Sequence, residues 1–351
     1  IAGRHRDKAE EAATVINREK AAGFQLDAND YHGLVDTMKE FDLVIGTLPG
    51  DVGYRSVKAA VEAGVDMVDV SYMPENPLTL NEDAIKANVT IVPDCGVAPG
   101  LSNMLVGRAV SKLDQIENIH IMVGGLPEEP VPPLGYIITW SIEGLIDEYT
   151  RMAKIVENGK VVEVDALTGL EEVEFPDVGK LEGFYTDGLR TLLHTIKGVR
   201  NMCEKTLRYP GHVEKIMLLK TLGFFDDHPI EVENARLPPR KITIKLLEEK
   251  LQRPKIKDIL AMKVEVSGTV GGSRKRYVYH LLDRYDQKSG VTAMARTTAY
   301  PASILAQLIA QKAIEEKGVI PLEKLCIKEK ISNKILAELE KRQVKIVESL
   351  H

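Results

Sequence analysis

Three short apolar segments near the start of the chain show no alternation of apolar and polar positions. They are Leu43–Ile45, Met67–Val70 and Val89–Val92, and between them lie Ser56–Ala63 and Leu80–Ala87, whose apolar residues have helical spacing. Apolar runs without alternation are typical of strands that are buried on both faces of a parallel sheet. The pattern therefore predicts strands and helices that alternate along the chain, joined by right-handed crossovers.

The same alternation continues on both sides of this region. Helical patterns at Arg6–Glu19 and Tyr31–Lys39 flank a strand pattern at Phe24–Ala28, and Leu101–Lys112 is helical after Pro99-Gly100. A doubly wound sheet has this order of elements. We therefore predict an α/β fold with a Rossmann-type, doubly wound parallel sheet.

The first residues, Ile1–Arg4, have the character of a strand end, and the sequence contains no GxGxxG motif. In a Rossmann fold this would be the second strand. We therefore expect the first strand, the glycine-rich phosphate loop and the first helix to lie upstream of Ile1. The alternative is a complete domain with a frayed start.

After the proline-rich loop Glu128–Pro133 the pattern changes to short strands with little helix between them. Lys263–Ser267 and Arg276–Leu282 have the pattern of a β-hairpin, and Ile256–Met262 is expected to be helical or irregular. We predict an α+β substrate-binding domain that is inserted into the Rossmann domain.

A long helix with Pro301 in its first turn is expected to return the chain to the Rossmann domain. The expected domains are residues 1–118 with the returning helix 297–317 for the dinucleotide, 119–296 for the substrate, and 318–351 as a helical tail.

The composition limits the possible functions. The 351 residues suffice for two domains, and 44% hydrophobic with 28% charged residues is typical of a globular protein. The net charge of −6 argues against a nucleic-acid partner. The sequence shows no secretory segment and no apolar run near the ~20 residues of a membrane span.

The three cysteines, Cys95, Cys203 and Cys326, are far apart in the sequence. They predict neither a disulfide framework nor a zinc site, so we expect a reducing, cytoplasmic environment. The histidines show no HExxH-type spacing, and we predict no metal.

Each of the three predicted strands ends in residues that suit a ligand better than a core. Ligands of an open α/β sheet bind outside the carboxyl ends of its strands, and Gly and Pro let the backbone approach a ligand closely. A plain tight turn would use the same residue types. The candidates for cofactor contacts at these ends are Thr47, Leu48, Pro49, Val70, Ser71, Gly96 and Pro99.

The end of the second strand selects the cofactor in such folds. Here it carries Arg4 and no acidic residue, and a guanidinium suits the 2′-phosphate of NADP. Arg4 could also stack on adenine or be a solvated charge at a helix start. We predict NADP, with NAD as the alternative. Asp27, at the next strand end, is a candidate for the adenine edge or for a helix N-cap.

Seven segments, taken in order, resemble the saccharopine dehydrogenase-like family, which includes saccharopine reductases and lysine 6-dehydrogenases. The segments are VSYMPENPL at 70–78, APGLSN at 98–103, GGLP at 124–127, LGYIITWS at 134–141, TDGLRTLL at 186–193, TLRYPGHVEK at 206–215 and TTAYPA at 297–302.

Within this family the chain looks more like a lysine 6-dehydrogenase, because Ala98 stands where saccharopine reductases carry Asp. The resemblance implies an NAD(P)-dependent oxidoreductase that deaminates L-lysine at its 6-amino group. The alternatives are an L-glutamate-forming saccharopine dehydrogenase or a related reductive condensing enzyme. A dinucleotide-binding scaffold without turnover is the alternative outside enzymes.

The implied reaction assigns roles to several polar residues. Asp94 would hold the amine or take its proton, or it would cap the following helix. Tyr72 and Ser71 would orient the substrate or the ribose, and Arg208 would clamp a carboxylate or serve a structural role. His212 would shuttle a proton or be a structural residue.

Other substrate-binding candidates are less specific. Trp140 would line the site or belong to the core, and Asp187 would bind an ammonium group or cap a helix. Gly124 and Gly125 are expected in a loop after a strand. The expected partners are a small amino-acid substrate and a second copy of the chain, paired through the inserted sheet.

Overall fold

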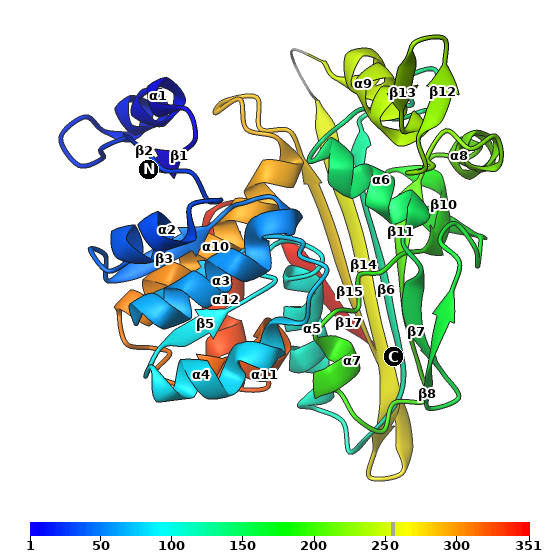
Figure 1. Ribbon diagram of the computed structural model, residues 1–351. Coiled ribbons are helices and arrows are strands. Elements are labelled where there is room, and N and C mark those ends of the chain that lie inside the picture. Colours follow the sequence, from blue (N-terminus) through cyan, green and yellow to red (C-terminus); the bar gives the residue numbers. More distant parts are fainter. Residues whose placement is uncertain (254–256) are drawn as a thin grey trace. The chain divides into compact units, whose positions relative to one another are not determined.

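The computed structural model describes residues 1–253 and 257–351, which divide into two compact units (Figure 1). Unit 1 comprises Ile1–Cys95 and Ala302–Pro321, and unit 2 comprises Gly96–Pro301 and Leu322–His351. Each unit is therefore built from segments that are far apart in the sequence. The binding roles expected for the two domains stay predictions.

Unit 1 contains two parallel sheets, so the predicted α/β class is confirmed. The larger sheet has the strand order β16-β5-β4-β3, and β1 pairs with β2. The strands are β1 (Ala2–Gly3), β2 (Phe24–Gln25), β3 (Leu43–Gly46), β4 (Asp66–Asp69), β5 (Thr90–Val92) and β16 (Gly318–Val319). The helices are α1 (Arg6–Ile16), α2 (Tyr31–Met38), α3 (Gly50–Ala63), the 3-10 helix η1 (Pro77–Leu80), α4 (Asn81–Lys86) and the C-terminal part of α10 (Ala293–Ala310).

Local chemistry fixes the ends of the helices in unit 1. Asp30 precedes α2, and its carboxylate accepts a hydrogen bond from the amide of Gly33 at 3.1 Å, as an N-cap does. α3 ends at Gly64, whose φ of 74° is a left-handed conformation that glycine adopts without steric cost. The apolar side chains of these helices pack on the sheet, with Val57 and Met67 in one buried core.

Unit 2 is organised around a sheet in which β6, β14 and β15, the longest strands, lie side by side (Figure 1). The strand order is β17-β15-β14-β6-β11-β10-β9, and β7 pairs with β11 and β8. The strands are β6 (Gln115–Pro127), β7 (Ala153–Glu157), β8 (Lys160–Val164), β9 (Glu171–Phe175), β10 (Gly179–Tyr185), β11 (Asn201–Arg208), β14 (Asp258–Val270), β15 (Ser273–Arg284), β17 (Ile346–Leu350) and the separate pair β12 (Ile230–Val232) and β13 (Ala235–Leu237). The helices are α5 (Leu101–Val110), α6 (Ile142–Thr150), α7 (Leu192–Thr195), α8 (His212–Thr221), α9 (Pro239–Leu251), α11 (Leu322–Cys326) and α12 (Glu329–Lys341).

β14 and β15 form the predicted hairpin. They pair across Gly271 and Gly272, whose φ angles are 57° and 81°. A two-residue turn with positive φ at both positions matches the twist of the flanking strands. Because β14 begins at Asp258, the helical or irregular structure expected for Ile256–Met262 is wrong from Asp258 onward, and Ile256 lies outside the described residues.

Two further predictions are wrong because distant strands supply backbone hydrogen bonds. β6 continues through Gly124 and Gly125, where it pairs with β14, so these glycines lie inside a strand and not in a loop. The tail expected to be helical contains β16 and ends in β17, which pairs with β15.

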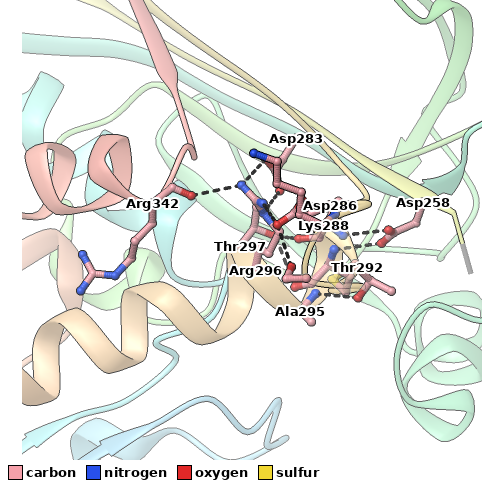
Figure 2. A network of polar contacts seen from close by, with 12 residues as sticks. Asp258, Asp283, Asp286, Lys288, Thr292, Ala295, Arg296, Thr297 and Arg342 are labelled. Carbon is pink, nitrogen blue, oxygen red and sulfur yellow. Dashed lines mark hydrogen bonds and ion pairs between the residues drawn. The ribbon is translucent and has the colours of Figure 1, made fainter.

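A carboxylate at the start of β14 caps α10 (Figure 2). The two side-chain oxygens of Asp258 accept hydrogen bonds from the amides of Ala293, at 2.7 Å, and Met294, at 2.9 Å. The helix therefore begins upstream of the predicted start at Thr297, and Pro301 lies in its interior and not in its first turn.

The first turns of α10 are also held by a buried ion pair (Figure 2). Arg296 Nε donates to Asp283 Oδ2 at 3.0 Å, and Arg296 Nη2 donates to the carbonyl oxygen of Arg342 at 3.1 Å. Both charged side chains are buried. The network therefore ties α10 to β15 and to the C-terminal end of α12.

Candidate active site

The carboxyl ends of β3, β4 and β5 lie next to one another in unit 1. The amide of Val70 donates to the carbonyl oxygen of Gly46 at 3.0 Å, and the amide of Cys95 donates to that of Asp69 at 2.8 Å. Predicted residues follow each of these ends, and the structure brings together Thr47, Leu48, Pro49, Val70, Ser71, Tyr72 and Asp94. This strand-end group is the first part of the candidate site.

Asp94 and Ser71 are buried in this strand-end group, and Tyr72 is half-buried. Asp94 has a φ of 51°, a left-handed conformation that is uncommon for a residue with a side chain. Such backbone strain is found at functional sites more often than elsewhere. Asp94 therefore stays the predicted group for the amine.

Asp69 is a buried carboxyl group at the end of β4 that we did not predict. Its side chain is 0% exposed, and its Oδ2 atom accepts hydrogen bonds from the amide of Ser71, at 3.0 Å, and from the Ser71 hydroxyl. Burial raises the pKa of Asp69 to about 7, and the nearby charge of Asp94 also raises it. An acidic residue inside the apolar segment Met67–Val70 was the available signal for this site.

A pocket of about 520 Å³ in unit 1 gathers the other predicted cofactor residues. Among the described residues, β1 pairs only with β2 and β3 only with β4, and residues of both β1 and β3 line the pocket. The predicted residues in its lining are Arg4, Asp27, Thr47, Leu48 and Pro49. Its volume lies in the range of small-molecule sites.

Two charged residues of this pocket differ in how their side chains are used. Asp27 accepts hydrogen bonds from the amide of Asn29, at 2.9 Å, and from its side chain, at 3.0 Å, so a local turn explains its position. Arg4 has an exposed side chain. An exposed guanidinium beside Gly3 suits a phosphorylated dinucleotide, because it offers charge and an added Cβ atom at Gly3 would meet no other atom.

Gly96 and Pro99 belong to unit 2. They lie in the turn that begins α5, where the amide of Leu101 donates to the carbonyl oxygen of Gly96 at 3.0 Å. Gly100 has a φ of 139° in this turn, and an added Cβ atom there would overlap the backbone of Gly96. The turn thus requires glycine for its own geometry, and contact of Gly96 and Pro99 with a cofactor stays a prediction.

Arg208 is buried inside unit 2, with a side chain that is 2% exposed. Its Nη2 atom donates to Glu148 Oε2 at 2.7 Å, and its guanidinium lies 4.6 Å from the ring centroid of Tyr136. Burial raises the pKa of Glu148, and the positive charge of Arg208 opposes this rise. Glu148 and the carbonyl oxygen of Leu207 thus pair with two of the guanidinium nitrogens, which favours the structural alternative, and the substrate clamp stays a prediction.

His212 is also held in the interior of unit 2. Its Nδ1 atom donates to the carbonyl oxygen of Leu134 at 2.9 Å, which leaves Nε2 to accept from the Tyr149 hydroxyl at 2.9 Å. Burial lowers the pKa of His212 to about 3, and the charge of Arg208 lowers it as well. These contacts and the lowered pKa favour the structural alternative, and the proton shuttle stays a prediction.

Glu204 is a second buried acid that we did not predict. Its side chain is 4% exposed, and burial raises its pKa to about 8, with further contributions from Glu148 and Asp187. An added Cβ atom at Gly188 would overlap the Glu204 carboxylate, so this glycine leaves room for the acid. Asp187 directly precedes Gly188 in the chain, and its Oδ2 atom forms an ion pair with Arg151 Nη1 at 3.9 Å.

Three other substrate-binding candidates have packing roles in unit 2. Trp140 is half-buried, and its ring lies so close to Gly144 that an added Cβ atom would overlap it. An added Cβ atom at Gly124 would overlap the carbonyl oxygen of Leu207, and one at Gly125 would overlap Met294. The two glycines therefore permit close packing around β6.

None of the helices among the described residues has both the length and the apolar character to cross a membrane. Within the same residues, no group of three or more His, Cys, Asp or Glu side chains is arranged to hold a metal ion.

Comparisons with known protein families give matches in both units. Residues 96–344 match the family model of the saccharopine dehydrogenase C-terminal domain. Residues 1–92 match the saccharopine dehydrogenase NADP binding domain.

Two similar curated proteins are themselves saccharopine dehydrogenases. The saccharopine dehydrogenase (NADP(+), L-glutamate-forming) of Schizosaccharomyces pombe is 30% identical over 262 residues, which cover 71% of this chain and 58% of the relative. The Saccharomyces cerevisiae protein of the same name is 26% identical over 218 residues, which cover 59% of this chain and 49% of the relative. The chain thus spans about half the length of these two relatives.

Solved structures share the fold. Apo saccharopine dehydrogenase (L-Glu forming) from Saccharomyces cerevisiae has a TM-score of 0.80 at 19% identity, covering 100% of this chain and 93% of that chain. Homospermidine synthase from Legionella pneumophila, in complex with NAD, has a TM-score of 0.62 at 14% identity, covering 94% of this chain and 80% of that chain. At these identities the likeness shows the fold alone.

Proposed function

The chain belongs to the saccharopine dehydrogenase family, and we propose that it is an NADP-dependent oxidoreductase that cleaves the secondary amine of saccharopine and releases L-glutamate. The observation that carries the proposal is that two domain models of one family match successive parts of the chain. The relative from Schizosaccharomyces pombe, at 30% identity, supports the same substrate. The match to an NADP binding domain confirms the cofactor prediction at the level of the domain family.

This substrate replaces lysine as our first choice. The relatives reported above are L-glutamate-forming saccharopine dehydrogenases, which was the alternative to a lysine 6-dehydrogenase. Lysine stays the second candidate because Ala98 stands where the resemblance places Asp in saccharopine reductases.

Residues of unit 1 would hold the dinucleotide. Arg4 would pair with the 2′-phosphate, and the backbone at Thr47–Pro49, which directly follows β3, would contact the cofactor. When bound, NADP accepts a hydride from the amine-bearing carbon of the substrate. The chain itself must position the amine, remove its proton and admit one water for hydrolysis of the imine.

The strand-end group of unit 1 offers the acid–base residues for these tasks. A protonated amine cannot release a hydride, so a carboxylate must first take its proton. We propose Asp94 for this role and Tyr72 with Ser71 for orientation, since all three follow the carboxyl ends of parallel strands. Trp140 and Asp187 stay proposed substrate contacts.

The test is turnover by the purified protein. With NADP and saccharopine we expect NADPH absorbance to rise with one L-glutamate formed per NADPH, measured enzymatically on the quenched reaction. A matched reaction with L-lysine, assayed for ammonia, serves as control. NADPH formation with lysine and none with saccharopine would move the assignment to lysine 6-dehydrogenase. Binding of NADPH without turnover of either would favour a scaffold.

We also propose a homodimer and a cytoplasmic location. The dimer proposal rests on the sheet of unit 2, whose edge strands β9 and β17 each pair on one side among the described residues. Sedimentation equilibrium should give twice the chain mass of 38.9 kDa. A single-chain mass at micromolar concentration would refute the dimer.

A further inference from the structure

Strands β12 and β13 form a hairpin with one apolar side. Among the described residues they pair only with each other, in a register that places Ile230 opposite Leu237 and Val232 opposite Ala235. Side chains alternate between the two sides of a strand, so these four apolar residues share one face of the hairpin. The charged residues between them lie on the other face, and the hairpin is therefore amphipathic.

The chain leaves the apolar face of this hairpin in solvent. Ile230 is 50% exposed, Val232 57% and Leu237 46%. A two-stranded hairpin that packs against nothing is only marginally stable in water. We therefore expect another molecule to cover this face.

Helices α8 and α9 add exposed apolar side chains at the same end of unit 2 (Figure 1). Each helix buries one side in the core of the unit. An exposed apolar pair at a spacing of four residues lies away from that core, Leu218 with Leu222 at α8 and Ile242 with Leu246 in α9. The hairpin is thus part of a wider apolar region.

This region is large enough for a stable protein contact. Between residues 217 and 246, nine large apolar side chains are 40 to 64% exposed, and we call them, with Ala235, the hairpin surface. Such a side chain removes about 100 Å² from water when it is buried completely, so the nine together offer about 450 Å². A stable interface buries about 800 Å² on each partner, a little over half of it apolar.

The charges around the hairpin surface favour a second copy of the chain as the occupant. Residues 212–251 contain seven Lys and Arg and seven Asp and Glu, whereas the whole chain has a net charge of −6. Two copies would therefore not repel each other at this surface. Surfaces that bind anionic membranes are rich in Lys and Arg, and this segment has no such excess.

We propose that the hairpin surface is the contact between two copies of the chain. In a two-fold symmetric dimer the same surface meets itself, and an apolar face is complementary to its own copy. The contact would give the hairpin the packing that it lacks within one chain. This inference rests on the homodimer proposed above and assigns it a surface other than the edge strands β9 and β17.

The experiment compares Val232→Lys with Val347→Lys. Both valines are exposed, at 57% and 53%, and they lie on β12 and β17, which each pair on one side among the described residues. The readout is the dissociation constant of the dimer, measured by sedimentation velocity over a range of protein concentrations. Val232→Lys should raise this constant at least about a hundredfold, because a two-fold contact buries the new charge twice. Val347→Lys should change it less than about threefold.

Equal dissociation constants of the two variants would overturn the proposal. A wild-type protein that stays a single chain at every concentration would also overturn it. If that single chain sedimented with vesicles of anionic lipid, the hairpin surface would be a membrane contact instead.

Hydrogen exchange of the wild-type protein covers the case in which Val232→Lys does not fold. The amides of β12 and β13 should exchange at least about tenfold more slowly above the dissociation constant of the dimer than below it. The amides of β8, which pairs only with β7 among the described residues, should exchange equally at both concentrations. A dimer whose hairpin amides show no slowing would overturn the proposal.

None of these measurements uses saccharopine or NADP. A dimer that Val347→Lys dissociates and Val232→Lys does not would keep the homodimer and overturn only this interface. A dimer that forms through the hairpin surface but turns over no saccharopine would refute the substrate and leave the interface intact.

Discussion

Replacing Arg208 by Met should strongly destabilise unit 2. The side chain is 2% exposed, and its loss leaves Glu148, whose side chain is 16% exposed, without its ion-pair partner at 2.7 Å. Removing one partner of a buried pair costs about 3 to 5 kcal/mol, because the remaining group must bury its charge alone or take up a proton. The hydrogen bond from Nη1 to the carbonyl oxygen of Leu207, 2.9 Å long, is lost as well.

Urea denaturation followed by tryptophan fluorescence measures this loss. Trp140 is the single tryptophan of the chain and lies beside α6, the helix that carries Glu148. With a urea dependence of about 3 kcal/mol per molar, the midpoint should fall by about 1 to 2 M. Arg200→Met is the matched control, since Arg200 is exposed and directly precedes the same strand, β11.

The double variant Arg208→Met with Glu148→Leu should recover most of the loss, because an apolar pair of similar volume replaces the ions. A urea midpoint of Arg208→Met equal to that of Arg200→Met would refute this reasoning. If, in addition, its KM for saccharopine rose about a hundredfold, Arg208 would be the carboxylate clamp that its sequence context first indicated.

Three other substitutions separate structural from functional roles. His212→Phe should lower the free energy of unfolding by about 2 kcal/mol. It should leave the pH dependence of kcat/KM between about pH 6 and 8 unchanged, because the native imidazole stays neutral there. Loss of a titration step near pH 6.5 from the kcat/KM profile would contradict this. Glu204 has a folded pKa of about 8, above its unfolded value, so the free energy of unfolding of the wild type should fall by up to about 1.4 kcal/mol per pH unit as pH rises from about 4.5 to 8. Glu204→Gln should flatten that slope in urea denaturation at several pH values, and an unchanged slope would show that Glu204 ionises normally. Arg4→Asp should shift the ratio of kcat/KM for NADP over NAD by at least about tenfold toward NAD, whereas Arg6→Asp should not; equal ratios would exclude Arg4 from the 2′-phosphate site.

The local pattern predicted the parallel sheet of unit 1 well. Strands β3, β4 and β5 lie within a residue or two of the apolar segments expected from the sequence. Such strands can be found because burial on both faces leaves a continuous apolar run. The family resemblance was confirmed for the same reason, since its motifs are contiguous in the sequence.

Features that depend on distant partners could not be predicted. Gly124 reads as a loop residue until β14 is known to pair with it, and α10 reads as starting at Thr297 until Asp258 is known to cap it. Arg208 and His212 have the residue types of a site, and only the structure shows that they pair with Glu148 and Tyr149 of α6.

Asp69 differs from these cases, because its type was visible and its burial was not. An acid within an apolar strand segment could be an exposed edge residue or a buried functional group. Only the strand order, with β4 between β3 and β5, shows that it is enclosed.

The sheet of unit 1 is completed by β16, a strand that is synthesised late. β16 pairs with β5 at Thr90 and Ile91, and the Thr90 hydroxyl donates to the carbonyl oxygen of Glu316 at 2.6 Å. While residues 96–317 are being synthesised, the outer edge of β5 lacks its neighbour and is open to chaperones or to other nascent chains. A gene fragment that encodes residues 1–95 alone would keep that edge exposed, so any attempt to produce unit 1 by itself needs residues 302–321 fused behind Cys95.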